Sequence, residues 1–186
     1  MFWKTQKVVE IKKELEILNN EISKYVCCFT GYRPDKLSWG YNEEDIRCIE
    51  MKQQLYFEIE KSINDGYKIF LCGMALGFDM ICAETVLELK KKYNYIKLIG
   101  ALPCKDQECR WQSSQQKRYN KILSQLDGIR CIYDTYVGPK CMLERNRYMI
   151  NNSSKVIALY DGQPGGTQGT LKYAKSKDIN IVILKP

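Results

Sequence analysis

The stretch KVIALYDGQPGGTQGT, residues 155–170, contains the clearest secondary-structure pattern of the chain. An apolar run (155–160) is followed by a segment with four glycines, and a helix-like segment (167–177) comes next. A continuous apolar run is typical of a strand that is buried on both faces, as in a parallel sheet. The stretch therefore predicts a β-strand, a glycine loop and an α-helix in succession.

The same succession of strand and helix recurs along the whole chain. Strands are predicted at 25–31, 68–73, 96–103, 128–133, 155–160 and 179–184, and helices between them at 43–64, 78–92, 106–125, 142–151 and 167–177. Because helical crossovers separate nearly continuous apolar strands, the predicted fold class is α/β, a doubly wound, mostly parallel, Rossmann-like sheet.

An additional amphipathic helix is predicted ahead of the first strand, at 5–24. Its apolar residues Val8, Ile11, Leu15, Leu18 and Ile22 recur at steps of three and four. The expected organisation is an N-terminal helix at 1–24 and one Rossmann-like domain at 25–186. The helix would pack on the core or on a second subunit, so a homo-oligomer is one of the alternatives.

Composition narrows the class of protein. With 45% hydrophobic and 27% charged residues in 186, the chain has the make-up of a folded globular domain. Apolar runs stay well short of a membrane span, and the N-terminus has no secretory signal pattern, so the expectation is a cytoplasmic protein with no membrane partner. The nine cysteines include no CxxC pair, and we expect buried free thiols, notably at Cys27, Cys72, Cys82 and Cys131.

The chain has no histidine, and this limits its chemistry. Catalytic triads, Cys-His pairs and histidine-bearing zinc sites are excluded, and no metal site is predicted. The net charge of +7 is dispersed over the chain, which indicates solubility and a general attraction to phosphates. No strip interleaves aromatic with basic residues, so a nucleic acid is not the expected partner.

Three predicted strand exits carry glycine: 30–33 (TGYR), 73–79 (GMALGFD) and 161–170 (DGQPGGTQGT). In doubly wound sheets, ligands bind beyond the carboxyl ends of the strands. Glycine lets the main chain approach a phosphate, and the following helix presents free N–H groups. We therefore expect the three loops to converge and to hold a phosphate, the alternative being that each glycine serves only a tight turn. Neither GxGxxG nor GxxxxGK[ST] occurs.

Several candidate residues have a second, structural interpretation. Arg33 can bind a phosphate or pair with Asp35 or Glu43, and Thr167 can contact a ligand or cap its helix. Asp79 can bind ribose or a metal, or serve only as a helix cap, and Asp161 can bind a sugar hydroxyl or form an Asx turn. The full set of ligand-binding candidates is Thr30, Gly31, Arg33, Gly73, Met74, Gly77, Asp79, Asp161, Gly165, Gly166, Thr167 and Thr170.

Four segments resemble signature motifs of one family. TGYRPDKL (30–37), GMALGFDMICAE (73–84), ERNRYMI (144–150) and PGGTQGT (164–170) are similar, in this order, to those of the YpsA-like family of the SLOG superfamily. The resemblance spans 25–186 and implies a small cytoplasmic bacterial protein with a nucleotide-binding Rossmann-like domain. GMALGFD is also similar to the glycine-rich loop of the DNA-processing protein A family.

A further resemblance, to the Lonely Guy phosphoribohydrolases, lies in MLERNRYM (142–149) and PGGTQGT. Those enzymes use an arginine of the first motif and a glutamate shortly after the second. Arg145 matches the arginine, but Lys172 stands where the acid is expected. The catalytic candidates are Arg145 and, as a substitute acid, Glu84, with Asp79 and Glu144 as other substitutes. Arg147, two positions on, cannot face the same way as Arg145.

Three functions follow from these residues and resemblances. The leading expectation is binding of a nucleotide or an ADP-ribose-like ligand, with a sensor role and no required cofactor. The alternatives are an N-glycosidase acting on nucleotides or NAD-like compounds, and binding of single-stranded DNA. Whether the protein is an enzyme is left open, because the expected glutamate is missing.

Overall fold

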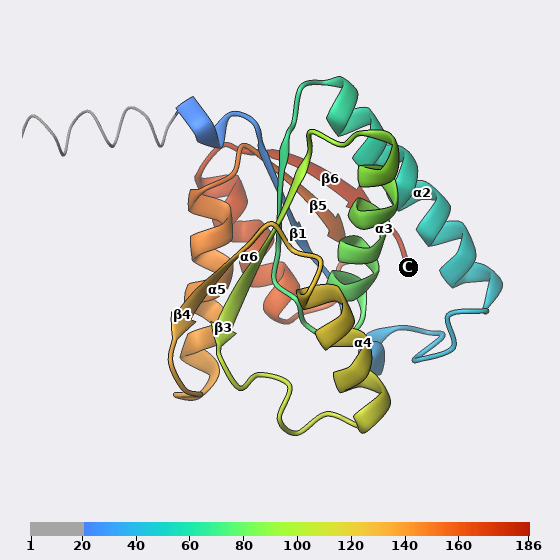
Figure 1. The fold of residues 1–186 in the computed structure, drawn as a ribbon, viewed down its shortest axis with the longest axis vertical. Coiled ribbons are helices and arrows are strands. Elements are labelled where there is room, and N and C mark those ends of the chain that lie inside the picture. The colour runs from blue at the N-terminus through green and yellow to red at the C-terminus, as the bar shows by residue number, and fades with distance from the viewer. Residues whose placement is uncertain (1–20) are drawn as a thin grey trace, which may run out of the picture.

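The computed structural model describes residues 21–186, which form a sheet of six parallel strands between two layers of helices (Figure 1). The predicted N-terminal helix lies outside the described residues except at its end, where residues 21–23 are helical. The strands are β1 (Val26–Thr30), β2 (Ile69–Cys72), β3 (Lys97–Cys104), β4 (Gly128–Tyr133), β5 (Lys155–Leu159) and β6 (Asn180–Leu184). The predicted α/β fold class is confirmed.

The helices alternate with the strands, as the sequence pattern predicts. They are α2 (Ile46–Asn64), α3 (Phe78–Lys92), α4 (Ser113–Leu123), α5 (Pro139–Asn151) and α6 (Gly166–Ser176), and a short 3₁₀ helix, η1 (Pro34–Lys36), precedes α2. Helices α2, α3 and α4 lie on one face of the sheet, and α5 and α6 lie on the other (Figure 1).

Strand β1 shows why the central strands are apolar throughout. Cys27 and Phe29 belong to the core cluster that packs against α2 and α3, whereas Val26 and Cys28 belong to the cluster that packs against α5 and α6. Successive side chains of a strand point to opposite faces, and here both faces are covered. All nine cysteines are free thiols, and Cys27, Cys72 and Cys82 are fully buried, while Cys131 is half-buried.

The strand order, β4-β3-β2-β1-β5-β6, fixes where a ligand can bind. The chain moves outward from β1 through β2, β3 and β4, and then crosses back to place β5 on the other side of β1. Crossovers therefore leave β1 and β5 in opposite directions, which opens a crevice beyond their carboxyl ends. Thr30 pairs in register with Ala158, so both strands end at the same level.

Three helices begin three or more residues away from the predicted position, each for a local reason, and α6 begins one residue earlier than predicted. Helix α2 begins at Ile46 because the carboxylate of Asp45 accepts the N–H of Arg47 at 2.9 Å. Helix α4 begins at Ser113, where Gln112 N–H donates to Gln115 Oε1 at 3.0 Å, and turns occupy the residues before it. Helix α5 begins earlier than predicted because Pro139 suits the first helical position.

Candidate functional site

A cavity of about 270 Å³ lies at the carboxyl edge of the sheet, between the exits of β1 and β5. The three glycine-bearing segments predicted to converge each contribute to it, and α5 forms another wall. Its lining residues are Phe29, Thr30, Gly31, Tyr32, Arg33, Asp35, Lys36, Ala75, Asp79, Met142, Arg145, Asn146, Met149, Gly166 and Thr167. The predicted convergence of the loops is thus present in the fold.

Three of the glycines have a packing role that differs from the predicted phosphate contact. A Cβ atom on Gly31 would lie 2.4 Å from the ring of Phe78, and one on Gly77 would lie 2.7 Å from the carbonyl oxygen of Tyr32. A Cβ on Gly73 would lie 1.4 Å from Nη1 of Arg145. These glycines let the β1 and β2 exits pack together and leave room for the arginine.

The N-terminus of α6 remains open to the cavity. The helix begins at Gly166, its N-cap is Gly165 with φ of 149°, and no side chain within residues 21–186 caps it. Thr167 lies inside the first turn, so the alternative that Thr167 caps the helix is wrong. A Cβ on Gly166 would meet no heavy atom of the described chain within 4 Å. First-turn N–H groups and the positive end of the helix dipole therefore face open space.

Two cations flank this open helix end. Arg33 directly precedes η1 and Lys36 ends it, and both residues line the cavity. The ammonium of Lys36 donates to the carbonyl oxygen of Pro164 at 3.1 Å, just before the helix. Arg33 forms no ion pair with any residue of the described chain, so its predicted alternative, a pair with Asp35 or Glu43, does not occur.

A buried ion pair forms the floor of the cavity. Arg145 Nη1 lies 3.3 Å from Oδ2 of Asp79, and the same oxygen accepts the N–H of Ala75 at 3.2 Å. Burial raises the pKa of the Asp79 carboxyl, and the neighbouring arginine opposes that rise. Nε of Arg145 is buried and has no partner within residues 21–186. Arg147 is exposed over the ring of Tyr173, which confirms that the two arginines face different ways.

A hydrogen bond joins the exits of the two central strands. The hydroxyl of Tyr32 donates to Oδ1 of Asp161, which also accepts the N–H of Gln163 at 3.1 Å. The second bond makes an Asx turn, as one interpretation of Asp161 predicted. Burial and the carboxylate raise the pKa of Tyr32, and the bond from the phenol lowers that of Asp161. Asp161 thereby holds the β5 exit to the β1 exit.

Two predicted ligand residues have their polar groups engaged elsewhere. Thr170 is buried, its hydroxyl donates to the carbonyl oxygen of Gly166 at 2.9 Å, and it accepts Nδ2 of Asn146 at 2.9 Å. Met74 is also buried, and its carbonyl oxygen accepts Nε2 of Gln107 at 3.0 Å. Neither residue lines the cavity.

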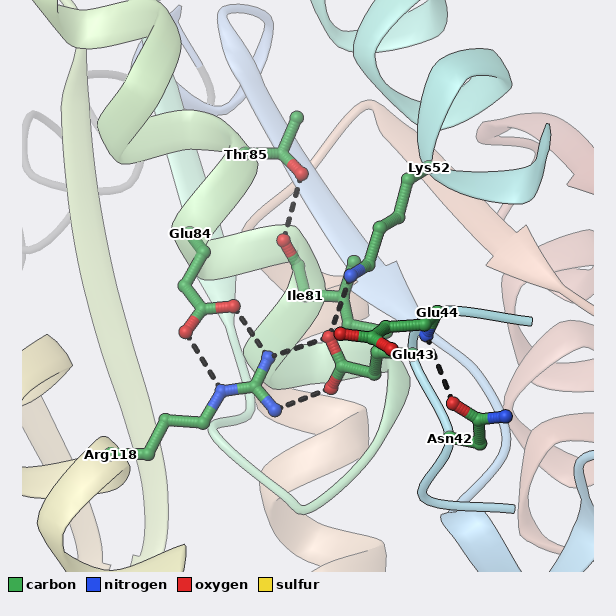
Figure 2. A network of polar contacts seen from close by, with 8 residues as sticks. All are labelled: Asn42, Glu43, Glu44, Lys52, Ile81, Glu84, Thr85 and Arg118. Carbon is green, nitrogen blue, oxygen red and sulfur yellow. Dashed lines mark hydrogen bonds and ion pairs between the residues drawn. The ribbon is translucent and has the colours of Figure 1, made fainter. Parts of the chain in front are cut away.

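The substitute acid Glu84 lies in a separate ion-pair network, shown in Figure 2. Nε of Arg118 donates to Oε1 of Glu84 at 2.8 Å, and the far side of the guanidinium binds Glu43, which also pairs with Lys52 at 2.7 Å. Glu84 follows Asp79 by five residues on α3, which turns it about 140° away from the cavity. Its position does not support the predicted catalytic role.

The other acid and the lysine named with it also lie outside the cavity. Glu144 accepts the hydroxyl of Tyr133, and Lys172 is exposed on α6. The carboxylates that line the cavity are those of Asp35 and Asp79. Within residues 21–186, no three acidic or cysteine side chains are grouped as metal ligands.

Sequence reasoning missed Lys36 and Asn146, which line the cavity. A signal for each was present. Lys36 follows Arg33 by three residues across a proline turn. Asn146 belongs to a helical face formed by Met142, Arg145, Asn146 and Met149, whose spacing of i, i+3, i+4 and i+7 puts them on one side of α5.

Comparison with known proteins identifies relatives across nearly the whole described chain. The family model described as the YspA SLOG family matches residues 27–184. A UPF0398 protein of Brevibacillus brevis is 30% identical over 149 residues, covering 80% of this chain and 79% of that protein. An uncharacterised SPbeta prophage-derived protein of Bacillus subtilis, YoqJ, is 36% identical over 139 residues, which cover 68% of this chain and 81% of that protein.

Two solved structures of DNA processing protein A share the fold. The Streptococcus pneumoniae protein superposes with a TM-score of 0.58 at 12% identity over 87% of this chain, which spans 50% of that protein. The Helicobacter pylori protein gives a TM-score of 0.60 at 19% identity over 87% of this chain and 65% of its own. That second structure is described as showing a unique single-stranded DNA binding mode. No helix within residues 21–186 is long and apolar enough to span a membrane.

Proposed function

This chain belongs to the YspA SLOG family, and we propose that it binds a nucleotide or nucleotide-derived ligand through its phosphate. The observation that carries the proposal is the open N-terminus of α6, which faces a cavity of about 270 Å³ with Arg33 and Lys36 beside it. Unpaired helix N–H groups, a helix dipole and two cations together favour an anion.

The ligand's phosphate would lie against Gly166, where the missing side chain allows close approach, and the ammonium of Lys36 lies beside the neighbouring Gly165. Thr167, buried in the first turn, would add its hydroxyl. Arg145 would contribute the positive charge of its guanidinium from the cavity floor, where Asp79 holds it in place.

The size of the cavity favours a compact ligand. Ligand pockets commonly enclose about 300–1,000 Å³, and this cavity lies just below that range. A nucleoside monophosphate, or one half of a larger molecule such as ADP-ribose or NAD, suits it best. We therefore propose an ADP-ribose-like or mononucleotide ligand, with the remainder of any larger molecule outside the cavity.

A sensor role fits the site better than hydrolysis. The buried carboxylate at the cavity floor, Asp79, is engaged by Arg145 and by the N–H of Ala75, and Lys172 replaces the glutamate of the hydrolases. Hydrolysis of an N-glycosidic bond needs a carboxylate that can stabilise positive charge or orient water. An N-glycosidase would release free base from AMP or NAD, and chromatography after long incubation detects this.

Single-stranded DNA is a second candidate ligand, favoured by the fold shared with DNA processing protein A. A DNA phosphate would use the same open helix end and the same two cations. This shared fold weighs against the expectation from sequence that a nucleic acid is not a partner, and binding of single-stranded DNA is therefore tested alongside the nucleotides. Binding through several phosphates would weaken steeply as the salt concentration rises.

Isothermal titration calorimetry distinguishes these candidates. AMP, ADP-ribose, NAD and an oligothymidylate are each titrated into the full chain and into Arg145→Ala and Lys36→Gln, with the exposed Lys172→Gln as the matched control. Saturable binding of a nucleotide that both cavity variants weaken and the control does not would support the proposal. Absence of binding by every nucleotide would reject it, and tighter binding of the oligothymidylate would favour the second candidate.

A further inference from the structure

A hydrogen-bond relay leads from α6 into the cavity and ends on Asn146. The carbonyl oxygen of Gly166 can only accept, so the hydroxyl of Thr170, 2.9 Å away, must donate to it. A hydroxyl has one proton, so the second partner of Thr170 must be a donor. That partner is Asn146, whose Nδ2 lies 2.9 Å from the Thr170 oxygen. The relay therefore fixes which end of the Asn146 amide is which.

The fixed amide leaves Oδ1 of Asn146 as an acceptor in the cavity. Asn146 lines the cavity and is half-buried, and no group of the described chain donates to its Oδ1. Asp79 lines the same cavity, and only its Oδ2 is engaged by the described residues, by Ala75 and Arg145. The cavity thus offers acceptors on its α5 and α3 sides, in addition to the donors and cations at the start of α6.

We propose that Asn146, oriented by Thr170, selects a ligand whose sugar carries free hydroxyl groups, and so a ribonucleotide. The inference rests on the proposed function, because the phosphate must first be held at the start of α6. A hydroxyl of ribose would donate to Oδ1 of Asn146, which an ether or a C–H group cannot do. Internal nucleotides of DNA have neither the 2′-hydroxyl nor a free 3′-hydroxyl, so this acceptor disfavours them.

The test compares the affinities of AMP, 2′-deoxy-AMP and 3′-deoxy-AMP for the full chain. Loss of one hydrogen bond is expected to weaken at least one deoxy analogue about three- to tenfold relative to AMP. The Asn146→Ala variant should bind AMP and that analogue equally well. For this variant, the ratio of the dissociation constant of the analogue to that of AMP should therefore fall to about one.

Thr170 is a positioning residue, and two substitutions separate that role from a merely structural one. Thr170→Val removes the hydroxyl, frees the amide of Asn146 to rotate and should reduce the selectivity for AMP. Thr170→Ser keeps the hydroxyl and should restore it. Thermal unfolding of each variant checks that the fold is kept, and the selectivity ratio is the readout that a general loss of stability does not change.

The outcomes separate this inference from the proposed function. If AMP and both analogues bind the wild-type chain equally, the inference is overturned and the proposed function stands. If selectivity for AMP persists in Asn146→Ala, the assignment to Asn146 is overturned. If none of the three nucleotides binds the wild-type chain, the proposed function fails and takes the inference with it.

Discussion

Arg145 and Asp79 form an ion pair, 3.3 Å between Nη1 and Oδ2, in which both side chains are more than nine-tenths buried. The pair joins α5 to the start of α3 beneath the cavity, and Gly73 leaves the space that the guanidinium fills. A buried charge is costly without its partner, so each residue depends on the other. The candidate site and the stability of the fold are therefore linked at this point.

Replacing Asp79 with asparagine should destabilise the protein by about 3 kcal/mol, because the charge of Arg145 would remain buried without a counter-ion. The matched control is Asp35→Asn, since Asp35 also lines the cavity but is exposed and forms no ion pair within residues 21–186. Urea denaturation measures both. A midpoint for Asp79→Asn equal to that of the control would contradict the assigned role of the pair.

Two glycine substitutions should have opposite effects. Gly73→Ala would put a Cβ 1.4 Å from Nη1 of Arg145, so the arginine must leave its pair, and both stability and AMP affinity should fall. Gly169→Ala, in α6, meets no heavy atom within 4 Å and should stabilise the helix by about 1 kcal/mol with AMP affinity unchanged. Equal unfolding temperatures for the two variants would argue against this packing.

The charge of Lys36 should matter for binding, and that of Lys172 should not. Lys36→Gln removes a cation beside the open end of α6 and is expected to weaken AMP about tenfold, the effect of about 1.4 kcal/mol. Lys172→Gln makes the same change of charge at an exposed position of α6, and Lys172 does not line the cavity. Parallel titrations at low and high salt provide the comparison. Equal losses in both variants would indicate a general charge effect.

The network around Arg118 predicts a pH dependence of stability. Burial alone would raise the pKa of Glu43, but the bonds from Arg118 and Lys52 outweigh it and hold the pKa below its usual value of 4.5. A lowered pKa in the folded state adds stability above pH 4.5 that is lost as the pH falls through the folded pKa. Glu43→Gln should therefore lack that part of the acid-induced loss, measured by urea denaturation between pH 6 and pH 3.

The fold could be predicted from the sequence because both faces of the sheet are covered. Burial on both sides makes the central strands β1, β2 and β5 largely apolar, and this pattern is readable in the sequence. The bounds of β4 and α3 are as predicted. The predicted helix starts were wrong where a side-chain hydrogen bond sets the first residue of the helix, as at Asp45 before α2 and at Gln112 before α4. Such contacts depend on local geometry that hydrophobic periodicity does not report.

The site was predictable in outline and not in its individual contacts. Parallel topology brings strand exits to one edge whatever their distance in sequence, so the convergence followed from the fold. The role of Gly73 could not be predicted in this way, because the side chain that fills the space beside it, Arg145, comes from a helix about 70 residues later. Asn146 was missed because its importance depends on Thr170, a contact between two helices.

A crystal structure of the protein soaked with AMP would show directly whether the open start of α6 holds the phosphate. We expect electron density for the phosphate at the first turn of α6, within hydrogen-bond distance of the N–H groups of Gly166 and Thr167 and beside Arg33 and Lys36. Density for the phosphate at any other place on the protein, with this turn unoccupied at saturating AMP, would contradict it.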